Sequence, residues 1–505
     1  MALFDNNDWP EPPKRAKEPP RNYEKEAKLL SGAGIPLGYK KEDSGSVVPL
    51  HYNHDRHLVT FGPIGSGKNS TSQTPALLDD DASALVIDVK GQLCAITARR
   101  RVQMGHEVAV LNPFDVLGIP TSAYNPLAHL DPESLSFASD CDRIAEGLVD
   151  QRKADHWELS ALDVVSLLIM YVRLFEPYPS LVRVRELLNL PEESEKDREG
   201  EIVKEGRVDF FKRVSRLDPY VSPYPSLVRV LAEGTARYAT GSREVQDSIQ
   251  TAVVQTRFLR DRAIAEVLSG EKEISFADLK RRKMTIFIII PPELLHTHGK
   301  FLRLLVLSAL GELIREPTQP AKRILFMLDE FAQLGSMALI ENAASIVRDY
   351  KIRLWIILQN LPQLKNLYKD NWESFLSAAG VVQVFTPNDL QTAKYFSERS
   401  GQELRWRKSI SSPGTGITST NQTETWEPLM RFDQLFEMRD EKHYLLCAGL
   451  PCAFMAWRFA YWDGGYEGLY DDDPYHMSTE DRAAFVTRAR TGQWIVGFKP
   501  ASGVR

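Results

Sequence analysis

A glycine-rich turn that ends in a lysine constrains this sequence more than any other feature. The segment GPIGSGK at 62–68 follows a short apolar run, LVTF, and precedes a stretch of helix length. A strand, a glycine turn and a helix in this order are typical of a phosphate-binding P-loop, because glycines let backbone N–H groups curl around a polyphosphate. The lysine adds a cation for the terminal phosphates. The predicted nucleotide-binding residues are Gly62, Pro63, Ile64, Gly65, Ser66, Gly67, Lys68, Asn69 and Ser70.

The residue after the lysine departs from the general P-loop motif. A serine or threonine usually stands there and binds magnesium through its hydroxyl group. This chain has Asn69, whose amide oxygen is a candidate ligand for Mg²⁺. The alternatives are that water and a second carboxylate hold the metal, or that the site is weakened or inactive.

Two acids end a second buried run and supply the rest of the chemistry that a P-loop needs. The run ILFML at 324–328 is followed by Asp329 and Glu330. We expect Asp329 to hold Mg²⁺, directly or through water, and Glu330 to be the catalytic base that activates water for attack on ATP. Gln359 ends the run LWIIL and is a candidate for contacting the γ-phosphate. Asp88 ends another such run, where capping a turn is the simpler role.

The hydrophobic pattern changes twice along the chain. Short buried runs separated by helix-length segments predict an α/β fold with a parallel sheet, first at 58–126 and again after residue 260. Apolar residues recur at helical spacing between them, which predicts an inserted all-α domain. A Ser/Thr/Gly-rich stretch at 409–425 predicts a mobile surface loop. The predicted units are a proline-rich flexible arm at 1–44 (a tail, or a tether to a partner), a nucleotide-binding domain at 45–130 and 260–465, the insert at 131–259, and a C-terminal tail at 466–505.

Charge, cysteine content and hydrophobicity exclude several classes of protein. The formal net charge of −6 argues against a protein whose whole surface holds nucleic acid, although a local basic channel is compatible with it. Four cysteines exclude a disulfide scaffold, and we interpret Cys447 and Cys452 as buried thiols, with zinc as the alternative. No apolar run reaches 18 residues, so we expect a cytoplasmic protein. Three basic clusters are ordinary solvated faces or nucleic-acid contacts: 99–101, 280–283, and Arg405 with Arg407 and Lys408.

The motifs occur in an order that resembles the TraG-like type IV coupling proteins, the ATPases of conjugation and type IV secretion. The resemblance covers about residues 45–460 and rests on an ordered series of blocks. After GPIGSGK these are DVKG at 88–91, NPF at 112–114, YNPL at 124–127, LDEFAQLG at 328–335, IRLWIILQNLPQL at 352–364 and TPNDLQTAKYFSERSG at 386–401.

The resemblance implies a RecA-like P-loop NTPase domain interrupted by an all-α domain, assembled as a hexamer that hydrolyses ATP with Mg²⁺. Such proteins bring a relaxase with its single-stranded DNA, or an effector protein, to the secretion channel and its ATPases. The resemblance also implies that Arg348 reaches the ATP of a neighbouring subunit, with Arg353 as a second arginine. Family members often have glycine after the P-loop lysine, so Asn69 departs less from the family than from the general motif.

Most members of the family carry N-terminal transmembrane helices, which we do not find in this sequence. We therefore expect the chain to reach the inner membrane only through the secretion apparatus. A nonhydrolytic docking protein, which would bind nucleotide and recruit cargo without cleaving ATP, is the alternative function.

Overall fold

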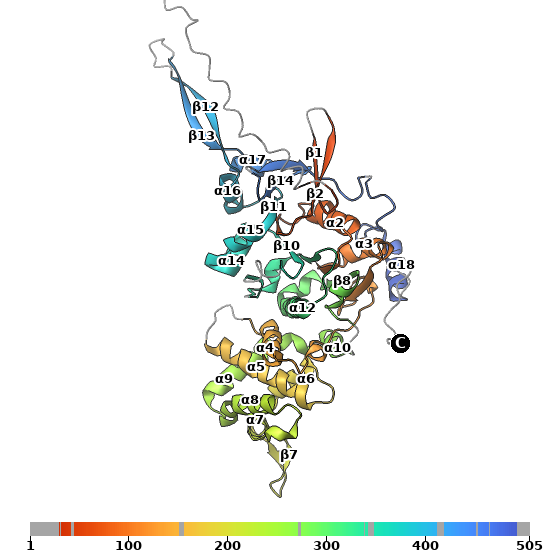
Figure 1. Ribbon diagram of the computed structural model, residues 1–505, viewed down its shortest axis with the longest axis vertical. Coiled ribbons are helices and arrows are strands. Elements are labelled where there is room, and N and C mark those ends of the chain that lie inside the picture. Colours follow the sequence, from red (N-terminus) through yellow and green to blue (C-terminus); the bar gives the residue numbers. More distant parts are fainter. Residues whose placement is uncertain are drawn as a thin grey trace, which may run out of the picture.

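An eleven-stranded sheet forms the centre of the molecule (Figure 1). The computed structural model describes residues 30, 32–41, 45–150, 156–270, 274–337, 339–341, 348–411, 419–450, 453–463 and 465–491. The strand order is β2-β1-β15-β14-β11-β3-β10-β9-β4-β8-β5. The parallel strands are β3 (His57–Phe61), β4 (Ala84–Asp88), β5 (Glu107–Leu111), β8 (Met284–Ile289), β9 (Ile324–Leu328), β10 (Ile352–Leu358) and β11 (Ala379–Val384).

Helices cover both faces of this sheet, so its central strands are apolar throughout. Every residue of β3, β4, β8, β9, β10 and β11 is buried, as expected for parallel strands with two covered faces. One face packs against α2 (Thr74–Asp79), α3 (Gln92–Gln103) and α18 (Thr479–Arg490). The other face packs against α12 (Leu295–Arg315), α14 (Leu361–Tyr368), α15 (Glu373–Ala378), α16 (Leu390–Glu398) and α17 (Phe432–Phe436).

The segment between β5 and β8 folds mainly as helices and forms one end of the molecule (Figure 1). It also contains a short hairpin, β6 (Glu195–Lys196) with β7 (Ile202–Lys204), so the prediction that it is entirely helical is wrong there. Its first helix packs along α12 and joins the two parts of the molecule. The helices are α4 (Phe137–Leu148), α5 (His156–Phe175), α6 (Leu181–Leu188), α7 (Arg207–Val214), α8 (Pro225–Ala236), α9 (Arg243–Gln255), α10 (Arg262–Ser269) and α11 (Asp278–Arg281).

An antiparallel edge extends the sheet beyond β11. It consists of β14 (Lys442–Cys447), β15 (Phe454–Trp457), β1 (Ile35–Lys41) and β2 (Val47–Tyr52). The flexible arm predicted at 1–44 is therefore wrong for Ile35–Lys41, which pairs with β2 and β15. Residues 1–29 of that predicted arm lie outside the described part of the chain.

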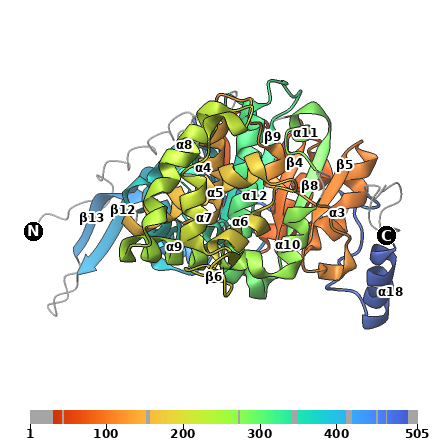
Figure 2. The ribbon, with the colours of Figure 1, turned by 90° about the horizontal axis from the view of Figure 1, so that it is seen from below.

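The predicted surface loop at 409–425 is also wrong for much of its length. Strands β12 (Gln402–Ser411) and β13 (Ser419–Pro428) pair as a long antiparallel hairpin that projects from the end opposite the helical segment (Figure 1). Figure 2 places this hairpin and α18 on opposite sides of the molecule. Within the described ranges, no helix combines the length and apolar character needed to cross a membrane.

Candidate nucleotide-binding site

The predicted P-loop forms a tight turn at the carboxyl end of β3. Gly65 and Gly67 adopt φ values of 78° and 82°, in the left-handed region that favours glycine. The Nζ atom of Lys68 donates hydrogen bonds to the carbonyl oxygen of Gly62 and, at 3.4 Å, to that of Pro63. The loop thus curls around its own lysine. A five-residue π-helix, η1 (Asn69–Gln73), follows directly and leads into α2.

The two predicted acids lie beside this loop because β9 and β3 both flank β10 and end at the same edge of the sheet. The Oδ1 atom of Asp329 is buried and has no hydrogen-bond partner among the described residues. Burial, with a contribution from Glu330, raises the pKa of Asp329 to about 6. A buried carboxylate oxygen without a partner fits Mg²⁺, which prefers oxygen ligands and takes one or two carboxylates together with phosphate oxygens.

Gln359 and Glu330 are in direct contact. The Nε2 atom of Gln359 donates to Oε2 of Glu330 at 3.1 Å and to Oε1 at 3.3 Å. Glu330 adopts a φ of 48°, a strained conformation for a residue with a side chain and one that clusters at functional sites. Burial lowers the pKa of Lys68, while the charges of Asp329 and Glu330 oppose that shift. Lys68 thus interacts electrostatically with Asp329 and Glu330, and Gln359 is joined to them by its hydrogen bonds to Glu330.

Asn69 and Ser70 lie at the start of η1 and take part in local hydrogen bonds. The Nδ2 atom of Asn69 donates to Oε1 of Gln92 at 2.8 Å, and the amide of Gln92 donates in turn to Asp473. The Oδ1 atom of Asn69 accepts a long bond of 3.4 Å from Thr74. Asn69 remains a candidate metal ligand through that oxygen. The hydroxyl of Ser70 donates to the carbonyl of Gly67 at 3.3 Å.

Arg348 lies at the amino ends of the parallel strands, whereas the P-loop lies at their carboxyl ends. It precedes β10, is exposed, and its carbonyl accepts a hydrogen bond of 2.6 Å from Arg323. A single chain therefore does not bring Arg348 to its own P-loop. Arg353 is buried within β10, where it donates to the carbonyl of His54 and lies over the ring of Tyr52.

Sequence reasoning missed an arginine that reaches the P-loop from the far end of the chain. Arg458 directly follows β15, and its Nη1 atom donates to the carbonyl of Ser66. Its guanidinium lies 4.9 Å from the ring centre of Phe385. The next turn adds a backbone bond of 3.1 Å from Tyr461 to Ser70. No motif marks Arg458, because its position depends on the pairing of strands that are distant in sequence.

Comparison with known proteins identifies the family. A family model described as type IV secretory system, conjugative DNA transfer matches residues 22–483. This chain belongs to that family. The resemblance to TraG-like coupling proteins is therefore confirmed.

Relatives in the conjugative DNA transfer family are distant in sequence. The probable conjugal transfer protein TraG of Sinorhizobium fredii (strain NBRC 101917 / NGR234) is 24% identical over 421 residues, covering 79% of this chain and 62% of that protein. The protein VirD4 of Rhizobium radiobacter is 27% identical over 413 residues, covering 78% of this chain and 55% of VirD4. The chain thus spans about three fifths of the length of the curated relatives it matches.

Solved structures of a plasmid coupling protein share the fold. TrwB in complex with ADP and Mg²⁺ aligns with a TM-score of 0.60 at 17% identity, over 87% of this chain and 92% of that chain. TrwB in complex with a non-hydrolysable ATP analogue aligns with a TM-score of 0.58 at 16% identity, over 87% and 92%. The predicted α/β class, a RecA-like P-loop NTPase fold, is confirmed.

Two of the three basic clusters of this family member make structural contacts. Arg101 is buried in α3 and donates to the carbonyls of Leu77, Asp80 and Ala82. In the second cluster, Lys280 donates to the carbonyl of Glu316, and Arg281 bonds the side chain of the same residue. Arg282 forms an ion pair with Glu107, and Lys283 forms one with Asp81. In the third cluster, Arg405 lies on β12 and pairs with Glu403.

Other predicted side chains have local roles. The Oδ2 atom of Asp88 accepts a bond of 2.8 Å from the backbone N–H of Cys94, which confirms its role in capping the turn before α3. Cys94, Cys141 and Cys447 are buried thiols, while Cys452 lies outside the described residues.

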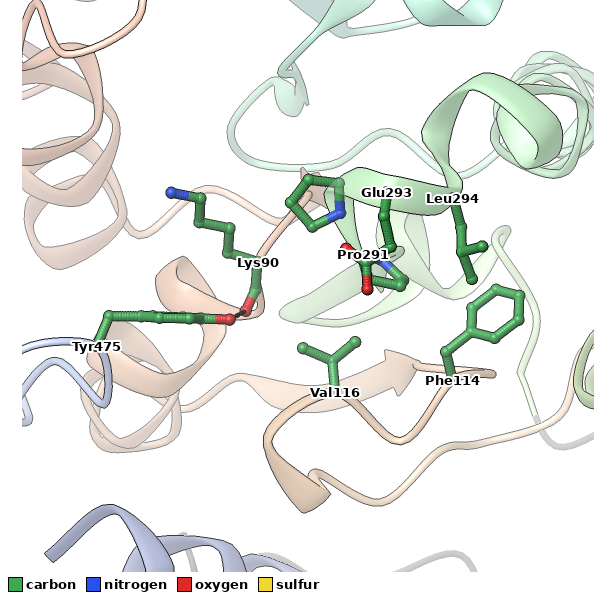
Figure 3. A pocket seen from close by; sticks show the side chains of 8 residues that line it. Lys90, Phe114, Val116, Pro291, Glu293, Leu294 and Tyr475 are labelled. Carbon is green, nitrogen blue, oxygen red and sulfur yellow. Dashed lines mark hydrogen bonds between the residues drawn. The ribbon is translucent and has the colours of Figure 1, made fainter. Parts of the chain in front are cut away.

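A separate cavity of about 570 Å³ lies beyond the carboxyl ends of β4, β8 and β5 (Figure 3). The hydroxyl of Tyr475 donates to the carbonyl of Lys90 at 2.8 Å and closes one side of it. None of the predicted nucleotide-binding residues lines this cavity. Its lining residues are Lys90, Phe114, Val116, Pro291, Pro292, Glu293, Leu294 and Tyr475.

Proposed function

We propose that this chain is an ATP-hydrolysing coupling protein of a type IV secretion or conjugation system. The observation that carries the proposal is the convergence of Lys68, Asp329, Glu330 and Gln359 at one edge of the sheet, next to the P-loop. A protein that only bound nucleotide would have no need of a carboxylate positioned to activate water. Membership of the conjugative DNA transfer family supports the second part of the proposal, that ATP hydrolysis serves conjugation or type IV secretion.

Each residue of the site has a distinct role in ATP hydrolysis. Backbone N–H groups of the P-loop and the ammonium of Lys68 bind the phosphates. Asp329 would hold Mg²⁺, with Asn69 as a second candidate ligand, and the bound metal would supply positive charge to the phosphates. Glu330 accepts a proton from water as the water oxygen attacks the γ-phosphorus and the bond to the β-phosphate oxygen breaks. Gln359 orients the Glu330 carboxylate and senses the γ-phosphate.

The proposed cargo and partners follow from the family. We infer that the chain acts as a homo-hexamer and brings single-stranded DNA with its relaxase, or an effector protein, to the secretion channel. Its proposed location is the cytoplasmic side of the inner membrane, where it docks through the secretion apparatus and its ATPases.

ATP turnover with and without single-stranded DNA tests the proposal in three proteins. The parent should hydrolyse ATP, and Lys68→Ala should lose nucleotide binding and turnover together. Glu330→Gln should bind ATP but not cleave it, because this change removes the proton acceptor and leaves the phosphate contacts intact. Parental turnover in Glu330→Gln would show that the base is assigned wrongly.

Asn69 favours a second candidate function, a nonhydrolytic docking protein. The residue that usually supplies a hydroxyl to magnesium is replaced, and its amide bonds to Gln92 instead. Parental protein that binds ATP and Mg²⁺ tightly but shows no turnover, even in the presence of single-stranded DNA and cargo, would establish this alternative.

A further inference from the structure

A buried guanidinium contacts the phosphate-binding loop, and no carboxylate among the residues that the structure describes pairs with it. Arg458 has only 7% of its surface exposed, and among the described residues it forms no ion pair. Its Nη1 atom donates to the carbonyl of Ser66, while its buried Nε atom has no hydrogen-bond partner in the described ranges. A buried cation is costly unless it is paired and its hydrogen-bond donors are satisfied.

The local backbone is shaped around this side chain. A Cβ atom added to Gly67 would lie 3.2 Å from the Nη1 atom of Arg458, closer than most such contacts. Gly67 also has a φ of 82°, so both its conformation and its neighbour favour glycine. The guanidinium packs on the ring of Phe385, which directly follows β11. Burial lowers the pKa of Arg458, and the charge of Asp440 opposes that shift in part.

The strand order fixes the side from which Arg458 approaches. Glu330 and Gln359 follow β9 and β10, which lie on one side of β3. Arg458 follows β15, on the other side of β3 beyond β11 and β14. A nucleotide with its γ-phosphate at Glu330 and its other phosphates along the P-loop would therefore extend toward Arg458.

We propose that Arg458 binds the non-terminal phosphates of the nucleotide, from the same subunit that supplies the P-loop. This inference rests on the proposed nucleotide-binding function. Phosphate oxygens would satisfy the guanidinium donors that protein groups leave without partners, and charge-assisted hydrogen bonds of this kind are strong. Because the α- and β-phosphates are present in both ADP and ATP, the contact contributes equally to both and not to the chemical step.

Calorimetric titration of the full chain with ADP and with a non-hydrolysable ATP analogue tests the assignment. Arg458→Met keeps an unbranched apolar side chain beside Phe385 but removes the guanidinium and its charge. Its affinity for both ligands should fall by a similar factor, about 10- to 100-fold. Turnover at saturating ATP should stay within about threefold of the parent. Arg458→Lys restores a point charge and should recover part of the affinity.

The controls separate this contact from a purely structural role. Arg490→Ala removes an exposed arginine paired with Asp115 and should leave both affinities unchanged. Without nucleotide, Arg458→Met should unfold at a temperature no lower than the parent, because a costly buried charge is removed, but ADP should raise its melting temperature less.

Three outcomes would overturn the assignment or the function beneath it. Parental affinities in both Arg458 variants would show that the bond to Ser66 is only internal. Loss of affinity for the ATP analogue alone would place Arg458 at the γ-phosphate. Parental nucleotide binding by Lys68→Ala would instead reject the proposed function.

Discussion

The carboxyl group of Asp329 is held in an environment that penalises its charge. Its Oδ1 atom is buried and has no hydrogen-bond partner in the described part of the chain, and Glu330 adds a second negative charge next to it. The raised pKa, about 6, means that the native state binds a proton more tightly than the unfolded chain does. The ionised carboxylate therefore destabilises the protein until a cation arrives.

Replacing this charge should stabilise the protein while removing a metal ligand. Without Mg²⁺ and nucleotide, Asp329→Asn should raise the free energy of unfolding at pH 7.5 by roughly 2–3 kcal/mol. The gain should shrink below pH 6 and disappear near pH 4, because the parental carboxyl group is then protonated itself. Urea denaturation at several pH values measures the effect, and exposed Asp472→Asn serves as the control. A gain that did not change with pH would contradict the assigned cause.

Arg101 illustrates a basic residue whose role is entirely internal. It is fully buried and bonds three backbone carbonyls and the hydroxyl of Thr285. Arg101→Met should lower the free energy of unfolding by about 3–5 kcal/mol, since it leaves those buried acceptors without donors. Its neighbour Arg100, which is half-buried and donates to the carbonyl of Leu78, is the matched control. Arg100→Met should cost less than about 1 kcal/mol in the same urea titration.

The site residues that could be predicted from the sequence are those that lie after the carboxyl ends of buried strands. Lys68, Asp329, Glu330 and Gln359 each follow an apolar run, and the carboxyl ends of parallel strands meet at one edge. Arg458 could not be placed in this way, because its position requires β15 to pair with β14 and β1.

At the scale of elements, the amino-acid composition of one segment predicted a loop where the structure has a hairpin. The segment 409–425 contains many serine, threonine and glycine residues, which predict a loop, yet its ends pair as β12 and β13. Threonine and tryptophan favour strands, and the pairs Leu404–Trp426 and Trp406–Glu424 lie on the same face of the hairpin. Trp406 and Trp426 are 46% and 64% exposed, so this apolar face is turned to solvent.

The hairpin should be dispensable for the stability of the sheet. Its ladder of hydrogen bonds joins β12 to β13, and its two tryptophans bury little surface. We predict that replacing 404–426 with a two-residue Asn-Gly turn, which keeps the buried Glu427, shifts the melting temperature by less than about 2 °C, because the tryptophans contribute little buried surface. Affinity for ADP should also be unchanged. A shift beyond about 5 °C would show that the hairpin supports the core.

At the scale of the whole molecule, the distribution of charge limits how DNA can bind. A chain with a net charge of −6 has no general attraction for phosphate, so contacts must come from a local set of basic residues. The basic residues of β12 remain candidates. Arg99 bonds the side chain of Asp471, and Arg100, Arg101 and 280–283 are engaged in the contacts described above.

We predict that single-stranded DNA binds weakly to the monomer and more tightly to an assembled ring. Six copies of a modest basic loop would each neutralise a few phosphates, so affinity should fall steeply with salt. The expected slope is about −0.7 logarithmic units per phosphate neutralised. Titration of a labelled oligonucleotide at several salt concentrations measures it in both states. Equal affinity in monomer and ring, or a flat slope, would favour a role with protein cargo alone.

Assembly should also decide whether Arg348 takes part in catalysis. Within one chain it lies at the amino ends of the parallel strands, opposite the P-loop, so any nucleotide that it contacted would belong to a neighbouring subunit. Arg348→Ala and Lys68→Ala should each be inactive alone. Mixed rings should recover some turnover, because some interfaces pair an intact P-loop with an intact arginine, a group worth about 10³–10⁵ in rate in GTPases. Rings proven to be mixed but inactive would exclude Arg348.

The order of strands in the sheet determines when each strand can pair with its neighbours during synthesis on the ribosome. β3 precedes the P-loop, yet its neighbours β10 and β11 leave the ribosome about 290 and about 320 residues later. At about 5–20 residues per second, the nascent strand waits roughly 15–60 s with both hydrogen-bonding edges open. Such edges template aggregation, whereas the helices made during the interval can form from local contacts. The nucleotide site can thus be completed only after β10 has been made, and β3 presents unpaired edges until then.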